Sequence, residues 1–343
     1  SQINTAYDGT TLDDDVTINT QGIQEWTVPA TGTYTFEVYG AQGGRSYLYG
    51  SSSWHDGGKG AKAVANFSLT QGDVLKIMVG QQGVENPRAT RGAGGGGGSF
   101  VVLSSGTTLL MAAGGGGGAG DYAYYGHGNS GTAGSAGGNS SGNTGGSSGG
   151  SNGSGGSNSS YVGGGAGWSS DGSSSNYGKG GKKFSNGGQG GNAYSDGKQG
   201  GFGGGGGSYA GAGGGGGYSG GGGGAWSYSG NGGGGGSFIK NTASNTTLTA
   251  AENEGHGKVV ITYCTGFCFE SASVVANNNY VDITLTAGAY STNGGSGALT
   301  ASDFSLTFAN NGGPASAASI SSVKKNNNAS EGSAGSLTGG ETV

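Results

Sequence analysis

Apolar and polar residues alternate along much of the first 112 residues. Residues 23–39 read Ile-Gln-Glu-Trp-Thr-Val, then a Pro-Ala-Thr-Gly turn, then Thr-Tyr-Thr-Phe-Glu-Val-Tyr. Alternation with a period of two is typical of β-strands, because successive side chains point to opposite faces of a sheet. This stretch therefore predicts two strands joined by a turn, with Tyr34, Phe36 and Val38 on one face.

The same reasoning predicts further strands on both sides of a long glycine-rich region. They are expected at residues 61–69, 74–79, 99–103, 107–112, 237–239 and 258–263. The residues expected in or next to the core are Tyr34, Phe36, Val38, Ile77, Val79, Val101 and Val260. Stretches that favour helix are nearly absent, and Thr, Ser, Val and Tyr favour strands, so the sequence predicts an all-β fold.

Glycine dominates the region between these strands and supplies 90 of the 343 residues. Six runs of five consecutive glycines lie at residues 94–98, 114–118, 203–207, 213–217, 220–224 and 232–236. Ordered glycine has no side chain to bury, so it must be held by backbone hydrogen bonds. Polyproline-II geometry points the N–H and C=O groups outward, where neighbouring helices can bond to them. The runs predict a bundle of polyglycine-II helices; the alternative is a flexible, solvated linker.

Aromatic residues flank the glycine runs and are the candidate binding residues of the chain. They are interpreted as a rim around the bundle, whose rings either pack or stack on sugars. The candidate ligand rim consists of Trp54, Tyr122, Tyr124, Tyr125, Trp168, Tyr177, Trp226 and Tyr228. Aromatic residues beside glycine more often serve packing, so the sequence leaves both roles open.

Several sequence blocks resemble the glycine-rich extracellular domain of the anaplastic lymphoma and leukocyte receptor tyrosine kinases. The blocks are Trp26-Thr-Val-Pro-Ala-Thr-Gly-Thr-Tyr34, Val38-Tyr-Gly-Ala-Gln-Gly-Gly44, Ile77-Met-Val-Gly-Gln-Gln-Gly83, Ala93 to Gly98, Ala112 to Gly117, Gly201 to Gly207 and Glu254 to Val259. The resemblance covers roughly residues 23–268 and implies a jelly-roll-like β-sandwich interrupted by a polyglycine-II insertion. The receptors bind small protein cytokines, but this chain lacks almost all of their cysteines, so that role is not carried over. Phage tail-tip adhesins also use polyglycine-II bundles, so the architecture does not fix a function.

Residues 269–343 change in character and look like the opening half of the bacterial immunoglobulin-like repeats of secreted surface proteins, especially those of the Bacteroidota. Strands are expected in 274–285, 299–308 and 320–323. Three or four strands do not close a sandwich that normally has seven. The sequence therefore predicts a partial Ig-like β domain.

Charge and hydropathy exclude two classes of partner. The net charge is −5 and the 14 Lys and Arg are scattered without a basic stripe, which argues against nucleic acid. No apolar run approaches the ~20 residues of a membrane helix, so no membrane insertion is expected. The chain begins at Ser1 without a methionine, which fits a mature secreted protein and predicts an extracellular or cell-surface location.

The residues that could carry chemistry are few. Cys264 and Cys268 are expected to form a local disulfide, as a close cysteine pair at the matching place of the receptors also implies; a zinc site with His256 would still lack a fourth ligand. The Asp13-Asp14-Asp15 triplet is interpreted as a solvated turn, not as a calcium loop. No phosphate-binding loop or catalytic set is found, so the sequence predicts a non-enzyme with no cofactor and no bound metal.

These observations divide the chain into five parts. They are an N-terminal extension at 1–22, a β-sandwich at 23–113 and 237–263, the glycine-rich insertion at 114–236, a Cys-pinned junction at 264–268 and the partial Ig-like domain at 269–343. Residues 1–20 are a candidate donor strand, because Ile3, Leu12, Val16 and Ile18 are apolar on a polar segment. The expected function is a structural subunit of a secreted bacterial fibre or surface assembly, a homopolymer joined by β-strand complementation. The alternative is a surface adhesin that binds a glycan or protein.

Overall fold

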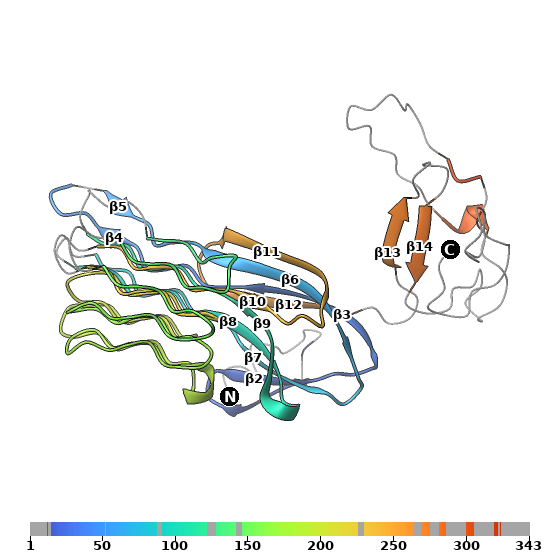
Figure 1. The fold of residues 1–343 in the computed structure, drawn as a ribbon, viewed down its shortest axis with the longest axis horizontal. Helices are drawn as coiled ribbons and strands as arrows, with labels where there is room; N and C mark the ends of the chain where they lie inside the picture. Colours follow the sequence, from blue (N-terminus) through green and yellow to red (C-terminus); the bar gives the residue numbers. More distant parts are fainter. Residues whose placement is uncertain are drawn as a thin grey trace. The chain divides into compact units, whose positions relative to one another are not determined.

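The computed structural model describes residues 12, 15–51, 53–87, 91–121, 128–141, 146–225, 230–263, 269–274, 281–285, 300–304, 319–321 and 323. The chain divides into two units, Ser1–Thr262 and Tyr263–Val343. The first unit ends one residue before residue 263, where the sequence predicts the end of the β-sandwich. Among the described residues of both units, regular structure consists of β-strands with three short 3-10 turns (Figure 1). The all-β prediction is confirmed.

The larger sheet has six strands in the order β1-β2-β7-β8-β9-β10. Its strands are β1 (Val16–Thr20), β2 (Ile23–Thr27), β7 (Val74–Met78), β8 (Ser99–Leu103), β9 (Thr108–Ala113) and β10 (Phe238–Ile239). All neighbouring pairs in this sheet are antiparallel. Strand β8 reads Ser-Phe-Val-Val-Leu and is buried on both faces, which explains why its apolar residues do not alternate.

The second sheet has four strands in the order β11-β6-β3-β12. They are β11 (Ser244–Asn253), β6 (Gly60–Leu69), β3 (Gly32–Tyr39) and β12 (Lys258–Tyr263). The indole ring of Trp26, from the six-stranded sheet, meets the ring of Tyr34 edge-on at a centroid distance of 5.8 Å. One face of each sheet therefore contributes to a shared core. A short ribbon of β4 (Ser46–Tyr47) and β5 (Trp54–His55) lies outside both sheets.

The predicted core is largely confirmed. Tyr34, Phe36, Val38, Ile77 and Val101 are all buried, and Val79 is half-buried. The prediction for Val260 is wrong, because its side chain is 42% exposed. In the run Val259-Val260-Ile261 every residue is β-branched and apolar, so the sequence does not indicate which face turns inward.

Two strands differ from the sequence-based expectation. Residues Val16–Thr20, part of the candidate donor strand, form β1 and pair with β2 of the same chain. Strand β11 was not predicted at all, because its residues are polar and almost all exposed. Its pairing with β6 breaks register twice, and Asn245 and Ala251 have positive φ angles of 50° and 57°, so this edge is irregular.

The glycine-rich region is ordered by hydrogen bonds between segments far apart in the sequence. Three runs continue directly from strands of the six-stranded sheet: 94–98 precedes β8, 114–118 follows β9 and 232–236 precedes β10. The segments then pass back and forth side by side, shown in green and yellow in Figure 1. The region carries no strand pairing of its own among its described residues.

The run 213–217 lies at the centre of this region. Its backbone groups bond to each of the other five runs, through Gly96, Gly115, Gly206, Gly221 and Gly233, at N···O distances between 2.7 and 2.9 Å. It also bonds to a sixth segment, where the N–H of Gly214 donates to the carbonyl of Gly163 at 3.3 Å. A β-strand bonds to two lateral neighbours at most. Bonding in six directions is therefore a different arrangement from a sheet.

Close approach of backbones leaves no room for side chains at this centre. A Cβ atom on Gly215 would collide with the backbone carbonyl of Gly115, and nearly every position of the six runs shows the same kind of conflict. Within these runs only Gly203 and Gly204 have positive φ. The requirement for glycine is therefore mainly one of space, not of unusual backbone dihedrals.

The second unit contains the hairpin of β13 (Phe269–Val274) and β14 (Val281–Leu285), which pair antiparallel. The sequence predicts a strand over residues 299–308, and this prediction is wrong at Ala301–Asp303, which form a 3-10 turn. Ile320, Ser321 and Val323 are described and are not in a strand, contrary to expectation. The remaining residues of these two segments lie outside the described residues.

We predict that Gly215→Val destabilises the chain by at least about 3 kcal/mol or prevents folding, because the backbone atoms around it cannot move apart without breaking several hydrogen bonds. Urea denaturation followed by circular dichroism measures the change. The matched control is Gly134→Val, since Gly134 is exposed and a Cβ there would meet nothing within 4 Å. Equal stability of the two variants would contradict the packed centre.

Candidate functional site

Aromatic residues mark successive turns of the glycine-rich region, and they alternate between two ends. Tyr161, Tyr177, Tyr194 and Tyr209 follow one another at spacings of 16, 17 and 15 residues, and they gather in one cluster. Trp168, Phe184, Phe202 and Tyr218 alternate with them along the chain, and they pack on the six-stranded sheet. We call the first set the outer turns and the second set the inner turns. Each pass of the chain between Tyr161 and Tyr218 thus begins and ends near an aromatic ring.

The four tyrosines of the outer turns form the tyrosine cluster. Tyr177 lies at its middle, with ring-centroid distances of 4.7 Å to Tyr161, 5.2 Å to Tyr194 and 5.3 Å to Tyr209. The rings of Tyr177 and Tyr209 are nearly parallel, at an interplanar angle of 10°. Tyr194 stands edge-on to both and is 52% exposed, so the cluster opens to solvent on the side of Tyr194.

An arginine borders this cluster. The guanidinium carbon of Arg91 lies 4.5 Å from the ring centroid of Tyr209, and its Nη2 donates a long hydrogen bond of 3.4 Å to the phenolic oxygen. Its Nε also faces a carboxylate oxygen of Asp196 at 3.4 Å. The cluster therefore combines ring faces with a cation and an anion, a combination suited to sugars or to other ring-shaped polar ligands.

Local hydrogen bonds position the loops that carry the tyrosines. The Oγ of Ser175 accepts from the N–H of Tyr177 and the N–H of Gly178, and the Nζ of Lys179 donates to the Ser175 carbonyl at 2.8 Å. Beside Tyr209, the buried Oγ of Ser208 donates to the carbonyl of Gly92 at 2.7 Å. The serine hydroxyls at these turns provide side-chain donors and acceptors, which glycine lacks.

Trp54 lies in a second aromatic group next to the first. Its ring meets Tyr47 edge-on at 5.3 Å, and the guanidinium carbon of Arg45 sits 4.4 Å from its centroid. Arg45 is in turn paired with Glu85 at 2.7 Å. The Oγ of Ser46 donates to the carbonyl of Arg91 at 2.8 Å, which joins this β4–β5 ribbon to the border of the tyrosine cluster.

Of the expected rim residues, the structure places Tyr177 and Trp54 in these two groups and Trp168 elsewhere. Trp168 belongs to the inner turns, with its ring 6.3 Å from Phe100 and 5.6 Å from Phe184, and these are packing contacts. Tyr122, Tyr124, Tyr125, Trp226 and Tyr228 lie outside the described residues. The prediction missed Tyr161, Tyr194, Tyr209 and Arg91, although the regular spacing of the tyrosines was a usable signal.

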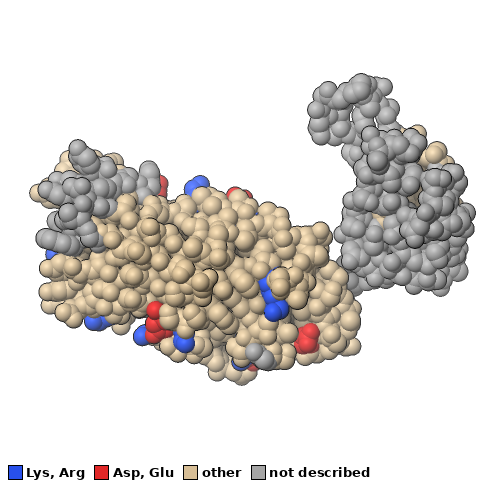
Figure 2. All heavy atoms as spheres, viewed as in Figure 1, with Lys and Arg blue, Asp and Glu red and all other residues tan. Residues whose placement is uncertain are grey.

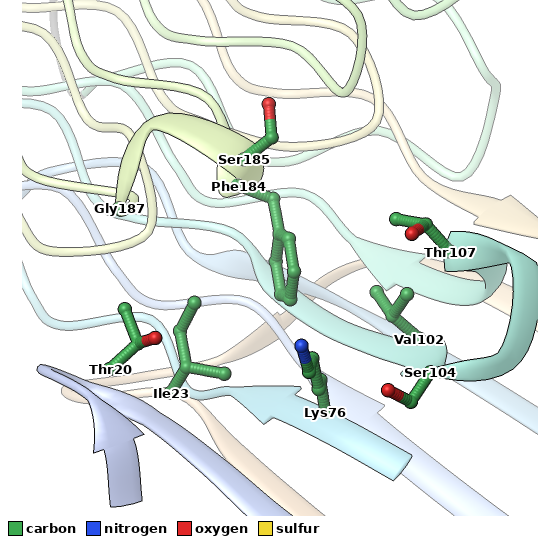
Figure 3. A pocket seen from close by; sticks show the side chains of 9 residues that line it. All are labelled: Thr20, Ile23, Lys76, Val102, Ser104, Thr107, Phe184, Ser185 and Gly187. Atoms are coloured by element: carbon green, nitrogen blue, oxygen red, sulfur yellow. The ribbon is translucent and has the colours of Figure 1, made fainter. Parts of the chain in front are cut away.

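A small cavity of about 220 Å³ lies where the inner turns meet the six-stranded sheet (Figure 3). Ile23, Val102 and the ring of Phe184 provide its apolar walls, and Figure 3 shows the Lys76 ammonium pointing into it. The remaining lining residues are Thr20, Ser104, Thr107, Ser185 and Gly187. The cavity is smaller than the roughly 300 Å³ at which ligand pockets usually begin. Phe184 itself is 5% exposed, so its face offers no platform for stacking.

Asp171 fixes the 3-10 turn η2 (Phe184–Asn186) that forms one wall of this cavity. Its carboxylate accepts from the N–H of Lys183 at 2.9 Å, from the Asn186 amide at 3.0 Å and from the Lys182 ammonium at 2.9 Å. Burial by itself raises the pKa of the Asp171 carboxyl, but these hydrogen bonds outweigh it and hold the pKa below its usual range.

Charged side chains elsewhere are sparse. Figure 2 shows them scattered over the visible face, several as blue and red neighbours. Among the described residues, no three His, Cys, Asp or Glu side chains gather in a way that could hold a metal ion. The Nδ1 of His256 accepts a hydrogen bond from the N–H of Gln82 at 3.1 Å, and Cys264 and Cys268 lie outside the described residues.

Two further observations concern membrane-spanning helices and family membership. No described helix is long and apolar enough to cross a membrane. No protein-family model matches the chain.

We predict that Asp171→Ala lowers the free energy of unfolding by about 1–2 kcal/mol near neutral pH. The native pKa is lower than the unfolded one, so the carboxylate stabilises the fold above the ordinary aspartate pKa of about 3.9, and this contribution is lost as the pH falls through the native value. Urea denaturation of both proteins at several pH values should show the difference shrinking below about pH 4. Asp171→Asn, which keeps an acceptor without the charge, is the control. A difference from wild type that is the same in acid and at neutral pH would contradict the role of the ionised carboxylate.

Proposed function

We propose that the chain is a structural subunit of a secreted extracellular fibre or surface assembly, built on a polyglycine-II bundle. In this proposal the glycine-rich region is inserted in a jelly-roll-like β-sandwich, like the receptor domains it resembles, and residues 269–343 begin an Ig-like repeat. The central run 213–217, with hydrogen bonds to six surrounding segments, is the observation that supports the bundle. Polyglycine-II helices pack in this way because their N–H and C=O groups radiate around the axis.

A bundle of this kind suits a mechanical role. Its interior consists of backbone, and a rise of ~3.1 Å per residue gives a pass of about eight residues a length of roughly 25 Å. Buried backbone hydrogen bonds protect the chain from local opening, which proteases require. Rigidity and resistance are the properties that an extracellular scaffold needs.

Assembly requires an interface, and the edge of β12 fits one. Among the described residues no strand pairs with its outer side. Strand β12 contains no proline or glycine, and its exposed Val260 lies on the solvent face. The opposite edge, β11, carries two register breaks, which discourage pairing with another chain. We propose that a strand from a second copy pairs with β12, a head-to-tail contact that extends into a filament.

Electron microscopy of the purified full chain tests this proposal. Fibres are expected for wild type, and Val260→Lys should abolish or shorten them, because a charge on an edge strand opposes the pairing of another strand. Val260 is exposed, so the change should leave the melting temperature of the monomer within a few degrees. The matched control is Val84→Lys, since Val84 is 46% exposed and lies outside the strands. Long fibres from Val260→Lys would eliminate β12 as the interface.

Deletion of residues 1–11 asks whether the segment before β1 supplies the added strand. The deletion leaves β1 and its pairing with β2 in place. Loss of fibres after this deletion would assign the donor to that segment, and normal fibres would exclude it.

The tyrosine cluster favours a second candidate, an adhesin that binds glycans. The exposed ring of Tyr194 with Arg91 and Asp196 nearby offers both stacking and polar contacts. A glycan-array screen of the purified chain tests it: binding should be lost in Tyr194→Ala and kept in Tyr49→Ala, whose ring is 62% exposed but lies outside the cluster. Equal binding by the two variants, or none by wild type, would remove this candidate.

A further inference from the structure

The tyrosine cluster contains more phenol rings in mutual contact than a sugar platform requires. Tyr161, Tyr177, Tyr194 and Tyr209 come from four separate turns, and each ring touches at least two of the others. The faces that Tyr177 and Tyr209 turn toward each other are not available to a ligand. The geometry instead brings together groups that react with one another when they are oxidised.

We propose that the tyrosine cluster is an oxidative cross-linking site, in which Tyr177 and Tyr209 are joined by a carbon–carbon bond. Their rings lie parallel, at a centroid distance of 5.3 Å, so ring carbons next to the phenolic oxygens can meet after a small sliding movement. Holding two reactants at contact distance converts a collision between chains into a reaction within one chain.

The reaction consumes one equivalent of hydrogen peroxide with a haem peroxidase as catalyst. Each phenol loses one electron and one proton, which leaves two phenoxyl radicals. The radicals couple at the carbons ortho to oxygen. The hydrogen on each coupled carbon then moves as a proton to the oxygen, which restores the aromatic ring and the hydroxyl. Overall, two tyrosines and one peroxide give one dityrosine and two waters, and the peroxide is reduced.

The exposure of the rings gives each a distinct part in this chemistry. Tyr194 is 52% exposed and can meet an external oxidant, whereas Tyr177 and Tyr209 are half-buried. Tyr194 stands edge-on to both, at 5.2 Å and 5.6 Å, close enough for an electron to pass from either ring to an oxidised Tyr194. The parallel, half-buried pair then couples within the chain, because the two rings already lie face to face.

The bond would add a covalent link between turns that are otherwise held by non-covalent contacts. It closes a loop of about 30 residues around one edge of the glycine-rich region, and a cross-link of that kind reduces the chain entropy of the unfolded state. The proposal does not depend on fibre formation, since the link lies within one chain.

The test treats the dilute purified chain with hydrogen peroxide and a haem peroxidase. Dityrosine fluorescence should appear in a product that migrates as a monomer on a denaturing gel, and mass spectrometry should show the loss of two hydrogens and a linked pair of peptides holding Tyr177 and Tyr209. Tyr177→Phe and Tyr209→Phe keep the ring but remove the phenol, so each should abolish the fluorescence of the monomer. Circular dichroism checks that both variants fold.

Tyr49→Phe is the control, because Tyr49 is exposed and outside the cluster, and it should leave the yield unchanged. A link between any other pair of tyrosines, a product found only between chains, or an undiminished yield in Tyr177→Phe would overturn the proposal. Absence of the link after peroxidase treatment would remove the cross-link and leave the fibre function standing, whereas absence of fibres would remove only the fibre function, so the two failures are distinguishable.

Discussion

The structure depends on the distance at which backbones approach one another in the glycine-rich region. Where a carbonyl of one segment lies against the Cα of the next, the space that a Cβ would need is already occupied, as at Gly215. The segments can therefore hydrogen-bond in every direction around a central run, which side chains would prevent. This arrangement replaces a hydrophobic interior with a hydrogen-bonded one.

That replacement leaves the region weakly stabilised by itself. A net gain of about 1 kcal/mol for each hydrogen bond is no larger than the roughly 1–2 kcal/mol required to fix the backbone of one residue, and glycine has the most freedom to lose. The aromatic turns offset this deficit. Phe184 is buried among Ile23, Met78, Phe100 and Val102 of the six-stranded sheet, and Trp168, Phe202 and Tyr218 pack against the same group. Apolar burial at the turns thus supplies what the glycine passes lack.

The sequence predicted those parts of the fold in which side chains determine position. Alternation located β3 and the inward face of Tyr34, Phe36 and Val38, because burial there distinguishes two faces. It could not orient β12, where three β-branched residues in succession are equally apolar. It missed β11, whose exposed polar residues are held as a strand only by the backbone of β6.

The candidate site was harder to predict for a related reason. The sequence indicated that aromatic residues flank the glycine runs. Which aromatic rings contact one another depends on the end of the glycine-rich region at which each pass of the chain finishes. The spacing of Tyr161, Tyr177, Tyr194 and Tyr209 carries that information, since an even number of passes returns the chain to the same end. Trp168 falls half a period out of step and reaches the inner turns, although its residue type is equally suited to a rim.

The sheet also explains how such a region can form in one arrangement. Runs of identical glycines have no side chains to fix their register, so a slip by one residue would satisfy the same hydrogen bonds. Three runs are anchored directly, because they continue from β8, β9 and β10, whose register is set by pairs such as Phe100 with Ala112. The passes between Tyr161 and Tyr218 are anchored at their turns, where an aromatic ring fits one position on the sheet or in the tyrosine cluster. In these passes side chains thus determine the register at the ends, and glycine provides the close packing between them.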